Sequence, residues 1–143
     1  MKSNFTIRIY GICIKDGNVL LSKENYSGVE MLKFPGGALE YGEGTKECLF
    51  REMREEFDVI IEAGSHFYTT DFFVSSAFHA DTQVMSIYYM MNIIDPNIPI
   101  GKVFKDQFGD QCLQWQSLSD WDPLNLSFPI DQHVGSLILT EFK

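Results

Sequence analysis

The sequence predicts an α+β domain, in which several strands are combined with two or three helices. Runs of β-branched and aromatic residues recur between turn signals, as is typical of strands. Helix start signals occur at Thr45, ahead of residues 45–57, and at Pro129, ahead of residues 129–142.

The first third of the chain indicates paired strands followed by a helix. Residues 5–14 and 19–23 flank the turn signal Lys15-Asp16-Gly17-Asn18, which predicts a β-hairpin. A short extended piece at 31–35 leads into the Gly36-Gly37 pair. We expect Thr45 to cap a helix that runs to about Phe57.

The remainder indicates further strands and a terminal helix. Strands are predicted at residues 59–61, 68–74, 84–94 and 112–115. Pro96 and Pro99 mark the loop after the third of these. A helical turn is expected at 117–121, and a helix at 129–142 with Pro129 near its first position.

Length and charge limit the classes of function. A chain of 143 residues is expected to form a single domain, residues 1–143. The net charge of −9 disfavours nucleic acid polymers and anionic membranes as partners. A small phosphorylated ligand is compatible with this charge if a metal ion or local cations hold it. The sequence shows neither a signal-peptide pattern nor a membrane-spanning run, so we expect a cytoplasmic protein.

Cysteine and histidine residues do not indicate a site. The three cysteines are far apart and lack CxxC spacing, which favours free thiols in a reducing compartment. No metal-ligand spacing relates the three histidines: His66, His79 and His133.

The helix at 45–57 gathers carboxylates on one face. Glu52 lies three residues before Glu55 and four before Glu56, so their side chains share an arc of the helix beside an apolar arc. Like charges at these spacings destabilise a helix slightly, and such carboxylates are ligands for hard divalent cations. From the helix alone, a solvated acidic face with Glu47–Arg51 and Arg51–Glu55 ion pairs is the favoured interpretation.

The wider pattern resembles the Nudix box, G-x5-E-x7-R-E-U-x-E-E-x-G-U, in which U is bulky and apolar. The residues that carry the resemblance are Gly37, Glu43, Arg51, Glu52, Met53, Glu55, Glu56 and Val59, with Phe34-Pro35-Gly36 before them. One position departs from the pattern, because Asp58 stands where the family has glycine. We expect Asp58 to adopt the left-handed conformation that ends the helix, with local strain rather than lost chemistry.

The resemblance implies a Nudix α/β/α sandwich, with a mixed β-sheet and a loop–helix–loop box. It implies Mg²⁺-dependent hydrolysis of the diphosphate in a nucleoside diphosphate linked to a group X, with Mn²⁺ as an alternative metal. We expect a (deoxy)nucleoside triphosphate as substrate, with ADP-ribose or another ADP-sugar as the alternative. A homodimer is compatible with the family.

The resemblance also assigns roles within the box. Glu52, Glu55 and Glu56 match the metal-binding glutamates, and the Gly37 carbonyl is a further candidate ligand. At the remaining two charged positions, Glu43 and Arg51 match residues that orient the box.

Other residues are candidates for the base and for binding substrate. Glu52 is the first candidate for the general base, and Asp110 is a second acid that lies outside the box. Substrate phosphates need cations, and the candidates near the box are Arg8, Lys23 and Lys33, although each also fits a solvated side chain. Aromatic residues at 68–73, 78, 88 and 89 are available either to stack on a base or to fill a core.

Two other classes of function compete with hydrolysis. A Nudix-like domain that binds a nucleotide without cleaving it is expected to have lost box glutamates, and a purely structural protein has no need for the cluster. All charged positions of the box are present, which favours the enzyme.

Overall fold

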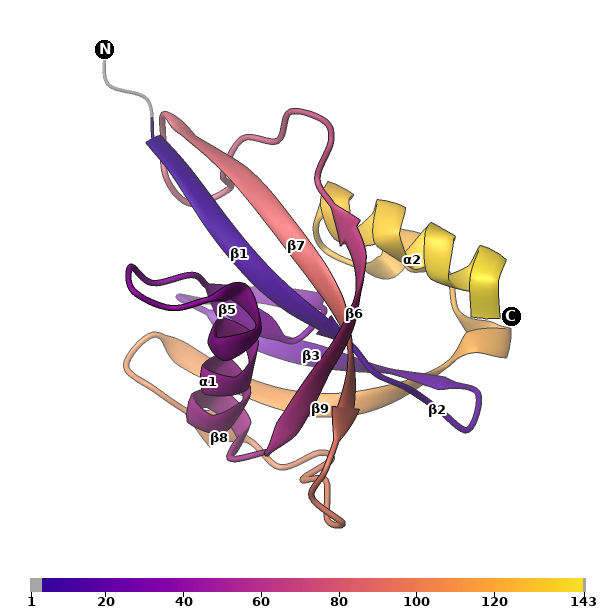
Figure 1. The fold of residues 1–143 in the computed structure, drawn as a ribbon. Helices are drawn as coiled ribbons and strands as arrows, with labels where there is room; N and C mark the ends of the chain where they lie inside the picture. The colour runs from indigo at the N-terminus through magenta and orange to yellow at the C-terminus, as the bar shows by residue number, and fades with distance from the viewer. Residues whose placement is uncertain (1–3, 143) are drawn as a thin grey trace.

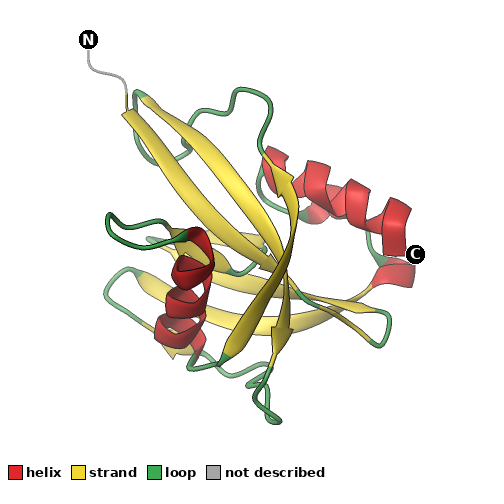
Figure 2. Ribbon diagram, in the orientation of Figure 1, coloured by secondary structure: helices red, strands yellow, loops and turns green. Residues whose placement is uncertain are grey.

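The computed structural model describes residues 4–142, whose strands lie between two α-helices (Figure 1, Figure 2). The elements are β1 (Asn4–Ile12), β2 (Ile14–Lys15), β3 (Asn18–Tyr26), β4 (Val29–Lys33), β5 (Gly36–Ala38), α1 (Thr45–Phe57), β6 (Ile61–Thr69), β7 (Thr82–Ile93), β8 (Phe104–Lys105), β9 (Gly109–Ser117), the 3₁₀ turns η1 (Leu118–Asp120) and η2 (Pro123–Asn125), and α2 (Pro129–Phe142). The predicted α+β class is confirmed. None of the helices within residues 4–142 is long and apolar enough to cross a membrane.

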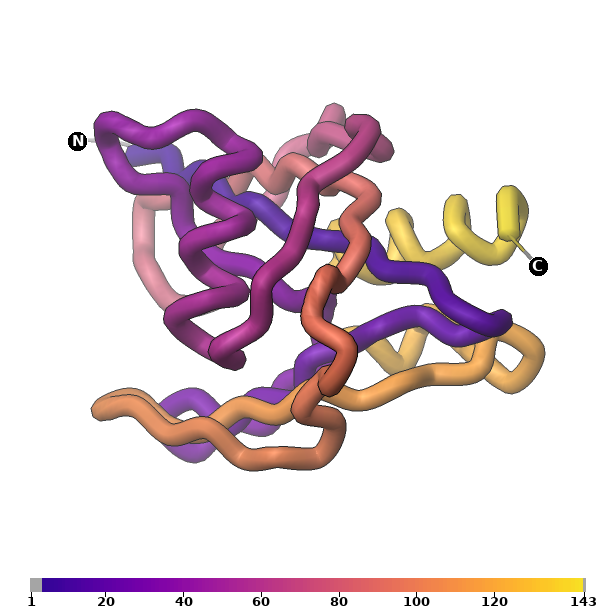
Figure 3. The backbone as a smooth tube through the Cα atoms, turned by 60° about the horizontal axis from the view of Figure 1, so that its bottom comes forward, coloured from indigo at the N-terminus to yellow at the C-terminus, as the bar shows by residue number. Residues whose placement is uncertain are grey.

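The strands form two sheets rather than one. The first has the order β5-β1-β7-β6, and it is mixed because β1 and β7 are parallel, from Asn4 opposite Thr82 to Ile12 opposite Met90. The second has the order β2-β3-β9-β8, with β4 also paired to β3, and all its pairs are antiparallel. A mixed sheet between helices agrees with the expected sandwich, and the turned view of Figure 3 keeps α1 and α2 apart on either side of the strands.

The hairpin predicted for residues 5–14 and 19–23 is wrong over most of its length. Only Ile14 and Lys15 pair with Val19 and Asn18, across a turn in which Asp16 and Gly17 have positive φ angles of 52° and 76°. The rest of the first run, β1, joins β7 in the other sheet. An alternating apolar pattern specifies a strand and its buried face, but it does not specify the partner.

Two adjacent predicted strands, 59–61 and 68–74, are also wrong. The structure has one strand, β6, whose pairing with β7 shifts between Ala63 and His66 and again between His66 and Tyr68. These irregularities break the two-residue period from which strands are recognised. Gly64 inside β6 is the sequence signal for them. The predicted strands at 84–94 and 112–115 are confirmed with shifted ends, as are the turn near 117–121 and the helix at 129–142.

The start of α1 differs from the prediction. Its N-cap is Gly44 rather than Thr45, and the Gly44 amide donates to Glu47 Oε1 at 3.2 Å. The Thr45 hydroxyl lies 2.7 Å from the Tyr89 hydroxyl instead. At the other end, Asp58 has φ 54° and ψ 41°, so the expected left-handed conformation is confirmed.

Two hydrophobic cores lie on opposite faces of the strands. One contains Leu49, Met53 and Phe57 of α1, and the other contains residues of α2 that include Val134 and Ile138. Adjacent strand residues supply both, because successive side chains point to opposite faces. α1 is therefore held by its apolar side, and Glu52 on its polar side faces Gly37 of β5.

Candidate active site

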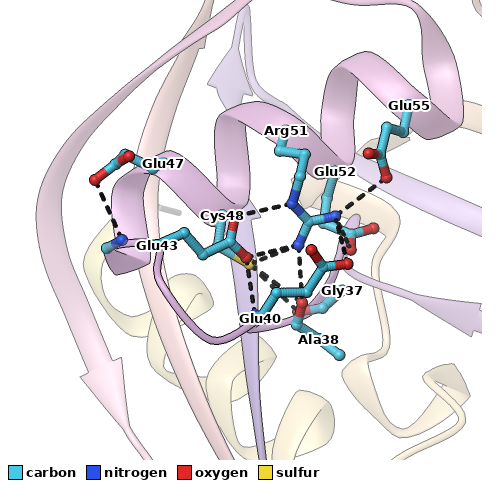
Figure 4. A network of polar contacts seen from close by, with 10 residues as sticks. Gly37, Ala38, Glu40, Glu43, Glu47, Cys48, Arg51, Glu52 and Glu55 are labelled. Carbon is cyan, nitrogen blue, oxygen red and sulfur yellow. Dashed lines mark hydrogen bonds and ion pairs between the residues drawn. The ribbon is translucent and has the colours of Figure 1, made fainter.

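Arg51 is the centre of a polar network that ties α1 to the preceding loop (Figure 4). Its Nε and Nη2 donate to the two carboxylate oxygens of Glu43, at 2.8 and 2.7 Å. Nη2 also donates to the Ala38 carbonyl at 3.1 Å. Nη1 donates to Glu52 at 2.9 Å and to Glu55 at 3.1 Å. One guanidinium therefore fixes the loop and two of the three clustered glutamates, in the bidentate geometry that arginine favours.

The network favours the ionised form of Glu43 and the neutral thiol of Cys48. Hydrogen bonds from Arg51 lower the pKa of Glu43 to about 2. Cys48 Sγ lies 3.5 Å from the Ala38 carbonyl, and burial raises its pKa to about 12. Because the thiolate is the reactive form, Cys48 is not a nucleophile at neutral pH.

Gly37 lies directly against the Glu52 carboxyl group. A Cβ atom at Gly37 would lie 2.4 Å from Glu52 Cδ, so this close approach requires glycine. Burial raises the pKa of Glu52, while the hydrogen bond from Arg51 lowers it. The backbone of β5 and this carboxylate thus form one polar wall.

Glu56 carries a buried carboxylate oxygen without a partner. Glu56 Oε2 accepts no hydrogen bond from any residue in 4–142. Burial raises its pKa to about 8, against a lowering influence of Lys33. A buried unsatisfied oxygen of this kind calls for an ion, a water molecule or a proton.

A cleft of about 500 Å³ adjoins this wall. Arg8, Lys33 and Ala38 line it on the side of the box, and residues 74–79 and 127–131 line it elsewhere. Another hollow, of about 570 Å³, lies on the outer face of α1 beside Lys46 and Phe50. Glu52 and Glu56 line neither hollow. The first is the candidate substrate site because it contains the cations Arg8 and Lys33, both of which interact electrostatically with Glu56.

The cleft contains a buried ion pair and a second cation. Lys33 Nζ lies 3.1 Å from Glu24 Oε2. Burial lowers the pKa of Lys33, but the interactions with Glu24, Tyr10 and Glu56 together outweigh burial and raise it, so the ammonium stays charged. Arg8 Nε donates to the Tyr10 hydroxyl at 2.6 Å. Two cations, Arg8 and the ion-paired Lys33, therefore lie at the end of the cleft that interacts with Glu52 and Glu56.

The residues present fit a hard divalent cation. Oxygen donors are available from Glu52 and Glu56, the latter with an oxygen that lacks a partner, and Gly37 provides the close approach. Within residues 4–142, no three acidic, cysteine or histidine side chains converge as a ready-made cage. Glu55 is turned to Arg51 and is 61% exposed. Mg²⁺ keeps several water ligands, so two or three carboxylates suffice.

The family model for the NUDIX domain matches residues 5–132 of the chain. The chain belongs to the Nudix family. The match spans the box, both sheets and the first residues of α2.

Solved structures of other proteins share the Nudix fold. MutT protein from Methanosarcina mazei Go1 is 17% identical, with a TM-score of 0.74 and coverage of 100% of this chain and 99% of its own. The E. coli ORF135 protein is 18% identical, with a TM-score of 0.71 and coverage of 96% and 91%. An ADP-ribose pyrophosphatase from Streptococcus suis is 15% identical, with a TM-score of 0.65 and coverage of 94% and 90%. At these identities, the likeness establishes the Nudix fold.

Two of the candidate substrate-binding residues do not line the Nudix cleft. Lys23 is exposed, and it points to the face of β3 opposite Glu24. Asp110 lies on β9, paired with Asn25 and Lys105. Arg8 and Lys33, in contrast, are brought together with the box glutamates.

Sequence reasoning missed two acidic residues of the cleft. Glu24 follows Lys23 in a polar run that is typical of an exposed segment. Only the pairing of β3 in the sheet places its side chain in the cleft. Asp131 accepts hydrogen bonds from the Tyr88 hydroxyl and from the Phe34 amide, the latter at 3.3 Å, and it is 2% exposed. Aspartate is common in the first turn of a helix, where it interacts favourably with the helix dipole, so nothing in the sequence indicated that Asp131 is buried.

Proposed function

We propose that this protein is an Mg²⁺-dependent Nudix hydrolase that cleaves the diphosphate linkage of a nucleoside diphosphate linked to a group X. A (deoxy)nucleoside triphosphate is the proposed substrate, and Mn²⁺ is an alternative metal. The observation that carries the proposal is the buried oxygen of Glu56, which has no partner within residues 4–142. It interacts electrostatically with Glu52 and with Lys33 and Arg8, the two cations of the cleft.

The proposed metal ligands are Glu52, Glu55, Glu56 and the Gly37 carbonyl. A bound divalent cation supplies charge neutralisation of the diphosphate, polarisation of the P–O bond and a more acidic water. Desolvation disfavours the ionised forms of Glu52 and Glu56 in the free protein. A bound cation would therefore stabilise these carboxylates more strongly than it would stabilise exposed ones. Glu55 needs only a side-chain rotation away from Arg51 to join them, because it is mostly exposed.

Glu52 is the proposed general base, and Arg51 and Glu43 are positioning residues. Glu52 is the box carboxylate in contact with the Gly37 backbone, and Arg51 Nη1 holds one of its oxygens at 2.9 Å. The other oxygen is available to a water molecule. Arg51 and Glu43 keep this geometry through their paired hydrogen bonds and do not line the cleft.

Arg8 and Lys33 are proposed to hold the substrate phosphates. Both line the cleft at the end that adjoins the glutamates, and both are charged. Lys33 is neutralised by Glu24 in the free protein, so phosphate binding shares or replaces that ion pair. Lys23 and Asp110 stay outside the proposed site.

ADP-ribose or another ADP-sugar is the alternative substrate. The structural similarity to the Streptococcus suis ADP-ribose pyrophosphatase supports this alternative, as the similarity to the MutT protein supports the Nudix fold. A nucleotide-binding module without catalysis is the other alternative, and the complete set of charged box residues counts against it.

The test is a substrate panel with matched variants. Purified protein is incubated with nucleoside triphosphates, ADP-ribose, NADH, nucleotide sugars and dinucleoside polyphosphates, each with Mg²⁺, Mn²⁺ or EDTA. We expect release of pyrophosphate or a nucleoside monophosphate, abolished by EDTA and lowered about 100-fold or more by Glu56→Gln. Glu62→Gln, which changes an exposed carboxylate on β6, is expected to leave turnover unchanged.

Circular dichroism and thermal unfolding establish that each variant is folded. Folded protein that hydrolyses none of these compounds with either metal would contradict the proposed function. Equal turnover by Glu56→Gln and wild type would contradict the proposed metal site.

A further inference from the structure

Three aromatic rings from three separate segments meet at the cleft, and we call them the aromatic clasp: Tyr26, Phe78 and Phe128. The Phe78 ring lies 5.2 Å from Tyr26 and 6.5 Å from Phe128, in edge-to-face contacts with interplanar angles of 61° and 67°. All three residues line the cleft. They come from the end of β3, the loop between β6 and β7, and the residue before α2.

The hydrophobic cores do not account for the clasp. None of its members belongs to either buried cluster, and Phe78 is 45% exposed. Phe108 stacks behind Tyr26 at 5.7 Å and is itself half exposed. One exposed ring, Phe78, and two partly buried rings, Tyr26 and Phe128, at the wall of a cleft are favourable contacts for a planar apolar ligand surface.

The clasp lies away from the phosphate-binding end. Lys33 pairs with Ser22, and Tyr26 is four residues further along β3, which corresponds to roughly 13 Å at the usual strand rise. The cleft therefore has the cations Arg8 and Lys33 at one end and aromatic rings at the other. A nucleotide has the same polarity, with an anionic chain and a planar base joined by a sugar.

The loop that carries Phe78 is organised by its own hydrogen bonds. Ser76 Oγ accepts from the Phe78 and His79 amides at 3.2 and 3.1 Å, and the Ser76 amide donates to the Thr82 carbonyl at 2.8 Å. The backbone of this turn thus sets the position of Phe78 independently of its ring contacts. A substitution of the ring is expected to leave the loop in place.

We propose that Phe78, with Tyr26 and Phe128, stacks on the base of the substrate and so makes the enzyme select nucleotides over diphosphates that lack an aromatic group. This inference rests on the proposed function, and it adds the residues that select the substrate. Stacking contributes to binding of the ground state and of the transition state alike, so its loss affects KM and leaves kcat unchanged.

The experiment compares three variants. Phe78→Ala removes the ring, and Phe78→Tyr keeps a planar ring. Phe73→Ala is the matched control, because Phe73 lies on the same loop, is 73% exposed and does not line the cleft. KM and kcat are measured for the preferred nucleoside triphosphate and for inorganic triphosphate, which has no base.

We expect Phe78→Ala to raise KM for the nucleotide by about 5- to 100-fold with kcat little changed. For inorganic triphosphate, KM and kcat are expected to be the same in wild type and in all three variants. For the nucleotide, Phe78→Tyr and Phe73→Ala are expected to have the KM and kcat of wild type. An unchanged KM for Phe78→Ala would overturn the proposal, as would an equal loss in Phe73→Ala.

A binding measurement separates this inference from the proposed hydrolysis. Calorimetric titration of the four common nucleoside monophosphates in EDTA reports base binding without turnover. Weaker binding by Phe78→Ala, in a protein that hydrolyses nothing, supports the clasp and contradicts the hydrolase. Normal hydrolysis combined with unchanged monophosphate binding contradicts the clasp alone.

Discussion

Gly37, Arg51 and Glu52 of the Nudix box are fitted to one another by close contact and by charged hydrogen bonds. The carboxyl group of Glu52 occupies the space that a side chain at Gly37 would need, and Arg51 holds that carboxyl from the other side. Five donors in a rigid fork let Arg51 serve Glu43, Ala38 and the clustered glutamates at once, which lysine does not reproduce. Position 37 is thus a glycine because the Glu52 carboxyl group must approach it closely.

Gly37→Ala tests this packing. The added methyl group would overlap the Glu52 carboxyl group, so we expect that carboxylate to move and kcat to fall about 100-fold. Steady-state kinetics measure the fall in kcat, and thermal unfolding measures any loss of stability separately. Gly101→Asn is the control, because position 101 is open and its positive φ of 77° suits asparagine. Undiminished turnover in Gly37→Ala would show that the contact is not needed.

The end of α1 shows how one element tolerates a departure from its family pattern. Asp58 occupies the left-handed position, and its amide and that of Val59 donate to the Arg54 and Met53 carbonyls at 3.1 and 3.3 Å. The helix therefore ends as it would with glycine. The cost is a side chain in a strained conformation, and a negative charge at the negative end of the helix.

Asp58→Gly is therefore expected to stabilise the protein. We expect the free energy of unfolding to rise by about 0.5–1 kcal/mol, with turnover unchanged, because Asp58 is exposed and does not line the cleft. Urea unfolding measures the change. Asp58→Asn removes only the charge, so it separates the charge contribution from the conformational one. A destabilised Asp58→Gly protein would contradict the assignment of strain to this position.

At the scale of the whole molecule, Asp131 joins three distant parts of the chain. It lies at the start of α2, and it accepts hydrogen bonds from Tyr88 on β7 and from Phe34 before β5. Burial raises its pKa from 3.8 to about 6. The folded protein thus holds this proton more tightly than the unfolded chain does. The stability that results is fully present below pH 4 and is lost as the pH rises through 6.

Asp131→Asn is expected to remove this pH dependence. A shift from 3.8 to about 6 corresponds to roughly 3 kcal/mol, at about 1.36 kcal/mol per pKa unit. Relative to the variant, wild-type protein should therefore lose about 3 kcal/mol of unfolding free energy between pH 4 and 6.5. Urea unfolding across this range measures it, and Asp120→Asn, an exposed change, serves as control. Parallel profiles for wild type and Asp131→Asn would rule out the shifted carboxyl.

Local pattern was sufficient to predict much of this protein. The spacing of Glu52, Glu55 and Glu56, the Gly-Gly loop before them and the terminal helix are properties of short segments, and the structure contains them where they were expected. The left-handed conformation of Asp58 followed from its position after the helix. Helical periodicity and turn preferences act over a few residues, so they can be recognised in the sequence without knowing which other segments pack against them.

Tertiary structure alone decided which segments meet. β1 pairs with β7 rather than with β3, Lys23 faces away from the cleft, and Glu24 and Asp131 face into it. The aromatic clasp likewise brings together residues 26, 78 and 128. Strand partners are selected by burial over the whole fold, and a one-residue change of register reverses every side chain in a strand. The Nudix box was therefore recognisable in one local motif, whereas the cleft beside it exists only in the assembled fold.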